Sequence, residues 1–214
     1  KYIGEACTHE AGHNLGLFHD GTTSGVEYFD GFGTGETSWA PIMGIGYYRN
    51  LTQWSKGEYQ GANNFQDDFA VMSAYSLLIR LDDHGNTRAN ATILPDGAAL
   101  SASGIIESEN DVDFFRFSAG AGPATLNIAP NSLGPNLDIL ASLYDANGIL
   151  IATNNPAAQL AAAFSLNLGA GTYYLSVAST GFGSPLTNGY SKYATRGQYT
   201  LTGTVTPPPS ANQP

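Results

Sequence analysis

The sequence has few basic residues, one cysteine and no long apolar run. Lys and Arg together number 8 in 214 residues, against 18 Asp and Glu, which gives a formal net charge of -10. A surface of this charge repels a phosphate backbone, so we expect no nucleic-acid partner. The single cysteine, Cys7, excludes an intrachain disulfide. Because no apolar segment reaches membrane-spanning length, we expect no membrane span, and we expect a monomer.

The chain divides into two regions of different composition. Residues 1–80 hold three of the four histidines, both tryptophans, both methionines and the cysteine, whereas residues 91–206 hold none of these. The second region reads as short alternating strands separated by Gly, Asn and Pro, which predicts an antiparallel β-sandwich. We place a linker at residues 81–90 and a Pro-rich tail at residues 207–214.

Three helices are predicted in the first region, which we expect to be mainly helical. The first covers residues 3–15 and ends at Gly16. The sequence Ser-Lys-Gly-Glu at 55–58 fits a capping box and predicts that a second helix begins there, and a short third helix is predicted at 66–74. The strands of the second region are predicted near residues 102–107, 113–118, 124–128, 139–144, 149–153, 162–168, 172–178 and 198–205.

A histidine-rich motif begins at the ninth residue. Residues 9–20 read His-Glu-Ala-Gly-His-Asn-Leu-Gly-Leu-Phe-His-Asp. On a helix, His9 and His13 lie on one face, so their imidazoles can bind one metal ion together. Gly16 can take a left-handed conformation that turns the chain and brings His19 back as a third ligand. Three protein ligands leave one coordination position open, which is typical of a catalytic zinc site.

Glu10 follows the first of these ligands and is the candidate general base. Zinc lowers the pKa of a bound water from about 15.7 to about 7 and polarises the carbonyl under attack. Glu10 would take the proton of the attacking water and later deliver it to the leaving amine. The motif therefore predicts a zinc cofactor and peptide-bond hydrolysis, and we identify no site for an organic cofactor.

The complete motif resembles the metzincin zinc peptidases, and the aspartate after the last histidine is most similar to their reprolysin (adamalysin) branch. A bare His-Glu-x-x-His also arises by chance, and a lone histidine on a helix is usually structural. The third histidine, the glycine and the aspartate favour the metal site. The resemblance implies a protein or peptide substrate and a methionine turn below the metal. Residues 40–44 match this turn, with Met43 as its methionine; the alternative is an ordinary core methionine.

Two departures from that family are visible. The tyrosine that some members carry shortly after the methionine is replaced by Ile45. Tyr47 and Tyr48 come later, and we interpret them as packing residues or part of a pocket wall. The upper subdomain of the family would precede Lys1, so the resemblance covers residues 1–80. We interpret Lys1 as a start inside a longer protein.

The second region carries an ordered series of motifs at residues 104–107, 111–117, 136–139, 143–148 and 171–177. This series resembles the bacterial pre-peptidase C-terminal (PPC) domain, which is appended to many secreted peptidases. The resemblance implies a jelly-roll-like fold, secretion to the extracellular space, and a role in substrate binding or processing.

Oxygen-rich side chains surround the start of the second region. Domains related to the PPC domain sometimes bind calcium near such a place, and carboxylate and amide oxygens suit that ion. The same residue types also cap turns, and we favour turn capping over calcium. The candidate calcium ligands are Asp82, Asp83, Asn86, Asp111 and Asp113.

Together these features predict an α+β protein, with the mainly helical lower subdomain of a metzincin catalytic domain followed by an all-β jelly-roll-like sandwich. We expect a secreted zinc-dependent endopeptidase. The alternative is a catalytically inert chain whose second region acts as a substrate-binding or processing module.

Overall fold

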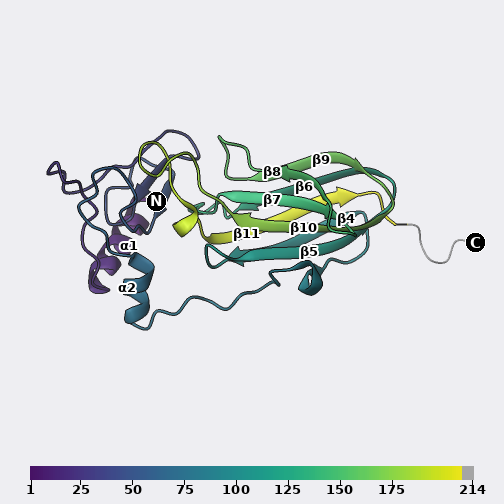
Figure 1. Cartoon of the computed structure of the whole chain (residues 1–214), viewed down its shortest axis with the longest axis horizontal. Helices are drawn as coiled ribbons and strands as arrows, with labels where there is room; N and C mark the ends of the chain where they lie inside the picture. Colours follow the sequence, from purple (N-terminus) through teal and green to yellow (C-terminus); the bar gives the residue numbers. More distant parts are fainter. Residues whose placement is uncertain (209–214) are drawn as a thin grey trace, which may run out of the picture.

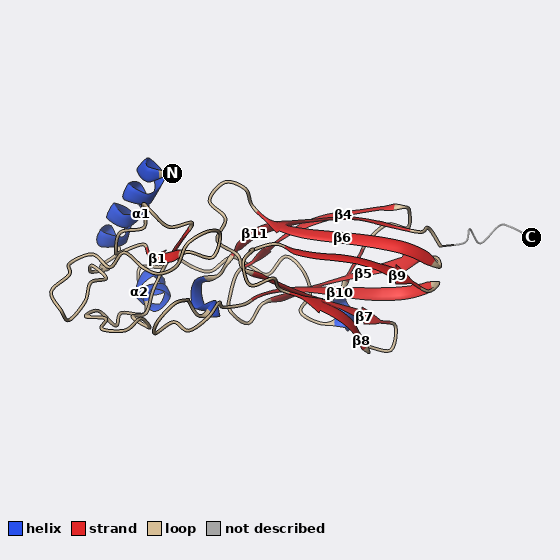
Figure 2. Cartoon of the chain, turned by 90° about the horizontal axis from the view of Figure 1, so that it is seen from above, coloured by secondary structure: helices blue, strands red, loops and turns tan. Residues whose placement is uncertain are grey.

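Strands of the second region bury every other side chain, and this alternation builds a sandwich of two sheets. In β6 (Gly122–Pro130), Ala124, Leu126 and Ile128 are buried, while Thr125 and Asn127 between them are exposed. The computed structural model describes residues 1–208. Figures 1 and 2 show the two layers of strands at one end of an elongated molecule, with the first region at the other end.

The two sheets have five and four strands and enclose one hydrophobic core. Their orders are β3-β5-β10-β7-β8 and β4-β11-β6-β9, and every neighbouring pair is antiparallel except the parallel pair β3–β5. Phe115, Leu143, Leu175 and Leu201 lie in the core between the sheets. The remaining strands are β3 (Thr92–Ile93), β4 (Ala99–Ile106), β5 (Val112–Ala119), β7 (Ile139–Asp145), β8 (Leu150–Asn154), β9 (Ala162–Leu168), β10 (Gly171–Ser179) and β11 (Gly197–Val205).

The prediction of an α+β protein with a mainly helical first region is wrong, because the described chain is mostly β-sheet. Its only two α-helices are α1 (Tyr2–Asn14) and α2 (Asp68–Ala74). The rest of the first region consists of loops and two short parallel strands, β1 (Trp39–Pro41) and β2 (Leu51–Gln53). A mainly helical metzincin subdomain is therefore absent from the described residues.

The helix expected to begin at residues 55–58 does not form, and the reason is local. The hydroxyl of Ser55 accepts a hydrogen bond from the backbone N–H of Gly57, only two residues away, which makes a tight turn. Gly57 has a φ of 72°, in the left-handed region that a right-handed helix excludes. Helix α2 begins later, where the Asp67 side chain accepts from the N–H of Ala70.

Two three-residue 3₁₀ turns complete the described chain. One, η1 (Arg88–Asn90), lies in the segment that leads from α2 into the sandwich, and the other, η2 (Lys192–Ala194), lies between β10 and β11. The predicted Pro-rich tail, 207–214, falls on residues of which only 207 and 208 are described. In the described part of the chain, neither α-helix is long and apolar enough to cross a membrane.

The two regions share a second hydrophobic core. Trp39, Leu51 and Tyr59 of the first region pack with Leu160 and Tyr190 of the sandwich. These are large, nearly fully buried side chains, so separating the regions would expose much apolar surface. The sandwich is thus packed against the first region and is not a freely hinged appendage.

Hydrogen bonds join the regions beside this core. The hydroxyl of Tyr193 donates to Asp67 at 2.6 Å and accepts from the backbone N–H of Phe69 at 3.0 Å. The guanidinium of Arg196 stacks on the Phe69 ring at 3.7 Å. Because Asp67 also caps α2, Tyr193 fixes the start of that helix against the sandwich.

We predict that Tyr193→Phe destabilises the chain by about 0.5–1.5 kcal/mol, because the buried Tyr193 loses its hydrogen bonds to the exposed carboxylate of Asp67 and the half-buried N–H of Phe69. Denaturant unfolding measures this. Tyr144→Phe is the control: the Tyr144 hydroxyl makes no hydrogen bond among the described residues, its ring packs 6.2 Å from that of Phe114, and the variant should be nearly neutral. Equal effects of the two variants would contradict the assigned role of Tyr193.

Candidate functional site

The three motif histidines converge at α1 and the turn after it, in the first region of the molecule. One ring nitrogen from each of His9, His13 and His19 lies within 4.8 Å of the others. The Nε2 atoms of His13 and His19 are 3.0 Å apart. Zinc–nitrogen bonds of about 2.0–2.1 Å in a tetrahedral arrangement place two ligand nitrogens about 3.3 Å apart. The side chains therefore have the spacing of a shared metal site.

Helix α1 and the turn after it produce this convergence. His9 and His13 are one turn apart on α1, and their rings are 4.9 Å apart between centroids. Gly16 has a φ of 82°, and the N–H of Leu17 bonds the carbonyl of Gly12, which closes the helix end. The chain then reverses, so that the ring of His19 lies 4.7 Å from that of His13.

The Nδ1 atom of each histidine lies close to an acceptor oxygen. The Nδ1 of His9 lies 2.8 Å from the carbonyl oxygen of Ile42, and the Nδ1 of His13 lies 2.9 Å from that of Leu17. A carbonyl oxygen can only accept, so both Nδ1 atoms carry the proton. The Nδ1 of His19 lies 3.2 Å from a carboxylate oxygen of Glu27. We therefore assign all three rings the tautomer whose Nε2 has a free lone pair, the form that binds metals.

This assignment makes the site a fit for a cation. When the Nδ1 atoms of His13 and His19 carry the protons, the two Nε2 atoms each have a lone pair and lie 3.0 Å apart. Two lone pairs at that distance repel unless a positive charge lies between them. The donor set consists of three imidazoles, which suit zinc and other borderline transition metals better than calcium or magnesium.

Met43 forms the floor below α1. Its side chain is fully buried and packs with Leu17 and Met72. A Cβ added to Gly12 would lie 2.5 Å from the Met43 sulfur, so the helix and the thioether are in close contact between the two helical histidines. The segment around Met43 is held by the backbone bond from the N–H of Asp20 to its carbonyl, at 2.9 Å. Met43 therefore lies beneath the helix that carries His9 and His13.

Asp20, next to the last histidine, points away from the centre into a buried carboxylate pair. Burial raises the pKa of Asp20 to about 8, with the negative charge of Asp68 as a further cause. Burial likewise raises the pKa of Asp68 to about 7. Each carboxyl has one oxygen without a hydrogen-bond partner among the described residues. Asp20 therefore has a structural environment and not that of a metal ligand.

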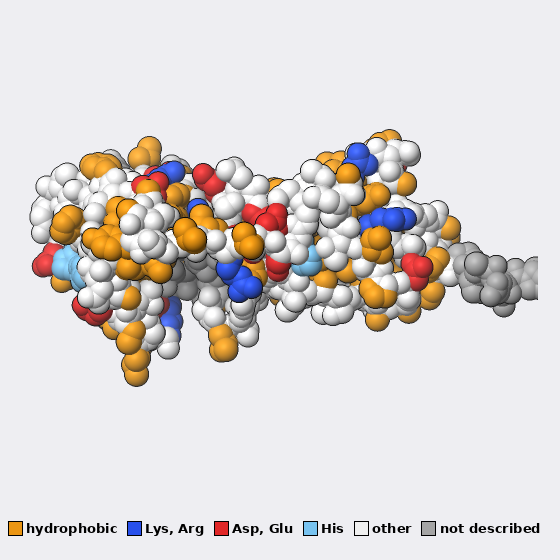
Figure 3. Space-filling view, turned by 90° about the horizontal axis from the view of Figure 1, so that it is seen from below, with side chains coloured by type: hydrophobic (Ala, Val, Ile, Leu, Met, Phe, Trp, Pro, Cys, Tyr) orange, Lys and Arg blue, Asp and Glu red, His pale blue; other side chains and the backbone are white. Residues whose placement is uncertain are grey.

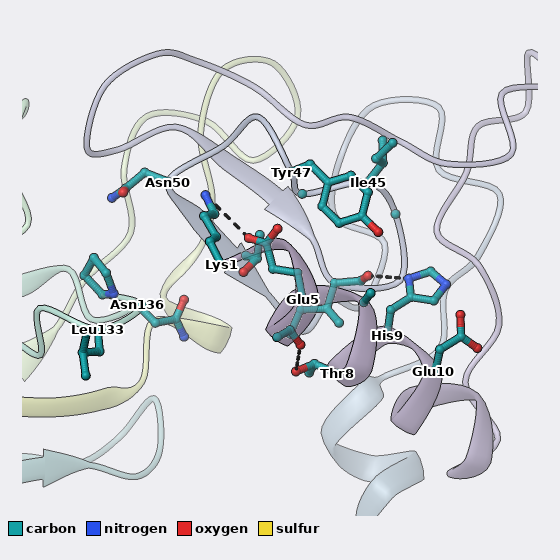
Figure 4. Close-up of a pocket in the computed structure, with 18 of the residues that line it drawn as sticks. Lys1, Glu5, Thr8, His9, Glu10, Ile45, Tyr47, Asn50, Leu133 and Asn136 are labelled. Carbon is teal, nitrogen blue, oxygen red and sulfur yellow. Dashed lines mark hydrogen bonds and ion pairs between the residues drawn. The ribbon is translucent and has the colours of Figure 1, made fainter.

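Glu10 lies on α1 beside the ring of His9, and Figure 4 shows its carboxylate at the mouth of a cleft. The cleft has a volume of about 980 Å³ and runs along α1 toward the sandwich. Tyr47 lines it, as the pocket-wall interpretation expects, whereas Tyr48 is not among the lining residues and is 80% exposed. The sandwich contributes the loop 132–136, which includes Leu133 and Asn136.

The motif does not reveal Glu27 and Tyr28, which lie beside the three histidines. The ring of Tyr28 is 4.4 Å from that of His19 and 6.1 Å from that of His9. Burial of its hydroxyl and the negative charges of Glu27 and Glu10 raise the pKa of Tyr28. Both residues lie in the long glycine-rich loop after the motif, where no spacing rule indicates which side chain returns to the histidines.

A second group of possible metal ligands lies where the linker meets the sandwich. Asp82, Glu107 and Asp111 bring one oxygen each within 4.8 Å of one another, and Asp83, His84 and Asp113 form a second such group. Figure 3 shows acidic side chains gathered near the middle of the molecule, well away from the histidines at its end. The structure thus brings together four of the five predicted oxygen ligands, in two adjacent groups.

Asn86 has a different role from the four aspartates. Its carbonyl oxygen accepts from the N–H of Val112 at 2.7 Å, and its amide donates to Asp82 at 2.5 Å. It therefore ties the linker to β5, as the turn-capping interpretation expects. Glu107, directly after β4, also belongs to the group, and the sequence analysis did not name it. It lies four residues before Asp111 and six before Asp113, and this spacing could have indicated it.

The carboxylates of this group are poorly satisfied. Both carboxyl oxygens of Glu107 and one each of Asp111 and Asp113 are buried without a hydrogen-bond partner among the described residues. Burial raises the pKa of Glu107 to about 8, with the negative charges of Asp111, Asp83 and Asp113 as further causes. Burial also raises the pKa of Asp113 to about 7, although the Tyr199 hydroxyl donates to it. Such a group favours a bound cation or shared protons.

Comparison with known families gives one match. Residues 111–179 match the bacterial pre-peptidase C-terminal domain, so the PPC resemblance is confirmed for this part of the chain. The match covers most of the sandwich and none of the histidine centre, and no metzincin catalytic domain is matched. A comparison with curated proteins gave no match.

Three solved structures illustrate the similarity of the sandwich. The pre-peptidase C-terminal domain of collagenase from Bacillus anthracis is 16% identical with a TM-score of 0.41, and the match covers 56% of this chain and 99% of that one. PliG of Aeromonas hydrophila, a periplasmic inhibitor of g-type lysozyme, is 13% identical with a TM-score of 0.37, covering 53% and 96%. A carbohydrate-binding module, CBM35 from Cellvibrio japonicus Abf62, is 16% identical with a TM-score of 0.23, covering 61% and 87%.

We predict that Gly12→Ala destabilises the chain by about 1–3 kcal/mol, because the new methyl group overlaps the buried sulfur of Met43. Gly4→Ala is the matched control in the same helix. A Cβ at Gly4 meets nothing within 4 Å, so this variant should stabilise α1 by about 0.5–1 kcal/mol. Thermal or denaturant unfolding measures both. A neutral Gly12→Ala would show that Met43 is not packed against the helix.

Proposed function

We propose that His9, His13 and His19 bind a zinc ion and that this centre hydrolyses peptide bonds with Glu10 as the general base. The observation that supports the proposal is the convergence of three imidazoles, each with an acceptor for its Nδ1 proton, on a point beside a carboxylate. Three protein ligands leave a coordination position open, which distinguishes catalytic from structural zinc sites.

In the proposed reaction, Glu10 transfers the protons and the cleft binds the substrate. Zinc, when bound, supplies a Lewis acid that polarises the carbonyl and favours ionisation of water. The carboxylate of Glu10 accepts a proton from the attacking water as the new carbon–oxygen bond forms. Glu10 then gives that proton to the amine nitrogen as the carbon–nitrogen bond breaks, which returns the carboxylate to its starting state. The cleft beside α1 gives an extended peptide access to this point.

The proposal also covers the class of substrate and the location of the protein. The resemblance of the motif to the metzincins supports a protein or peptide substrate over other hydrolase substrates. The PPC domain supports an extracellular location, since this domain is described from bacterial pre-peptidases. We propose that the chain acts in a secreted bacterial zinc endopeptidase.

A second candidate function is favoured by the family match. The PPC domain is the one part of the chain with a confirmed family, and it is a non-catalytic module. In this alternative the described chain cleaves nothing, and the sandwich binds or helps to process a substrate protein. The first region would then serve mainly as a folded base that packs against it.

Calcium binding at the acidic group is a further part of the proposal. The buried, unpartnered oxygens of Glu107, Asp111 and Asp113 support it over turn capping alone. Together with Asp82 and Asp83 they offer the hard oxygen ligands that calcium prefers. Since Asp82 and Asp83 belong to the linker, a bound ion would hold the linker on the sandwich.

We predict that the chain purified without chelators contains one zinc ion and cleaves casein or a quenched fluorescent peptide. Glu10→Gln should keep the zinc and lower the rate by about 10²–10⁴-fold, because the general base is lost. His13→Ala should lose the zinc, whereas His84→Ala should retain it, because the fourth histidine lies in the linker. Elemental analysis and an initial-rate assay measure these outcomes.

Two results would decide between the candidate functions. Full activity in Glu10→Gln would reject the assigned mechanism. Stoichiometric zinc with no cleavage of any protein or peptide by the wild-type chain would reject the peptidase and support the binding or processing module.

We predict that millimolar calcium raises the melting temperature of the zinc-loaded chain by about 5–10 °C, as expected for a ligand present at about 100 times its Kd. The same concentration of magnesium serves as the ionic control. Glu107→Gln should abolish most of the shift, and Glu109→Gln, two residues away, should retain it. An equal shift with calcium and magnesium, or none, would leave turn capping as the role of these residues.

A further inference from the structure

His19 differs from the other two histidines in what holds its Nδ1 atom. His9 and His13 donate to backbone carbonyls of Ile42 and Leu17, which are fixed by the chain path. His19 instead faces the side chain of Glu27, whose carboxylate oxygen is 3.2 Å away. The tautomer of His19 therefore depends on one replaceable residue.

The loop after the motif places Glu27 beside His19. The N–H of Thr22 bonds the carbonyl of Val26 at 2.7 Å, and the N–H of Phe29 bonds the carbonyl of Asp20 at 2.7 Å. These two bonds fold residues 20–29 back on themselves and return the chain to the third histidine. The ring of Tyr28 packs on His19 at 4.4 Å and limits its rotation.

Without Glu27, the other neutral tautomer of His19, with the proton on Nε2, competes with the metal-binding form. A neutral imidazole carries its proton on either nitrogen, and the Nε2 of His19 is 3.0 Å from the Nε2 of His13. With the proton on its own Nε2, His19 would donate to His13, and both metal-binding lone pairs would be occupied. An acceptor at Nδ1 opposes that state because it stabilises the proton on the other side of the ring.

We propose that Glu27 is a positioning residue that holds the proton of His19 on Nδ1 and so keeps Nε2 free for the metal. The inference rests on the proposed zinc centre and adds to it the residue that fixes the tautomer of His19, the third ligand. Glu27 does not touch the metal or the substrate. Its side chain is 66% exposed, so the effect depends on the direct contact of 3.2 Å between its carboxylate and Nδ1 and not on burial of its charge.

The test compares Glu27→Ala, which removes the acceptor, with Glu27→Gln, which keeps an acceptor oxygen but loses the charge. Asp30→Asn is the charge control, because Asp30 lies in the same loop, is 69% exposed and pairs with Arg49 at 3.2 Å and not with a histidine. The tautomer of His19 is read from its imidazole ¹⁵N shifts in the metal-free chain at about pH 8. The zinc Kd is measured by competition with a chromophoric chelator.

In Glu27→Ala we expect the His19 signal to move toward the Nε2–H tautomer and the zinc Kd to rise by about 10–100-fold. Glu27→Gln should retain the wild-type tautomer and most of the affinity, and Asp30→Asn should match the wild type. An unchanged tautomer in Glu27→Ala overturns the inference, even if the affinity falls. Failure of the wild-type chain to bind zinc would reject the proposed function, while the metal-free tautomer comparison would still decide the role of Glu27.

Discussion

The convergence of three imidazoles is the arrangement on which the proposed zinc centre depends, and the local structure of the first region produces it. Helix α1 supplies two rings from successive turns, and the left-handed Gly16 reverses the chain to supply His19. The carbonyl of Ile42 and the buried Met43 lie under the helix. The Nε2 atoms of His13 and His19 are 3.0 Å apart, and with the Nδ1 atoms protonated the proposed zinc ion would lie between their lone pairs.

The sandwich packs directly against the region that carries the three histidines. It shares a hydrophobic core with the first region, and its loop 132–136 lines the cleft that contains Glu10. The acidic group lies between the two, where Asp82 and Asp83 of the linker meet Glu107 and the strand β5. A cation there would fix the linker to the sandwich. The confirmed PPC domain is therefore continuous with the histidine region through a core, a cleft wall and a linker.

Local rules predicted the elements that depend on nearby residues. Helix α1, the turn at Gly16 and the alternating strands follow from spacing within a few residues, and the structure shows them near the expected positions. The prediction of a mainly helical first region was wrong in part because Ser55 accepts a hydrogen bond within a tight turn and does not begin a helix. Glu27 and Glu107 reach their groups through loop reversal and strand pairing, which no local pattern specifies.

X-ray absorption at the zinc K-edge tests the central proposition most directly, because it reports the atoms bound to the metal in solution. For the zinc-loaded chain we expect three imidazole nitrogens at about 2.0–2.1 Å and one further oxygen at a similar distance. His19→Ala should lower the number of imidazoles to two. A first shell containing sulfur from Cys7, or one made of carboxylate oxygens without imidazole, would contradict the account.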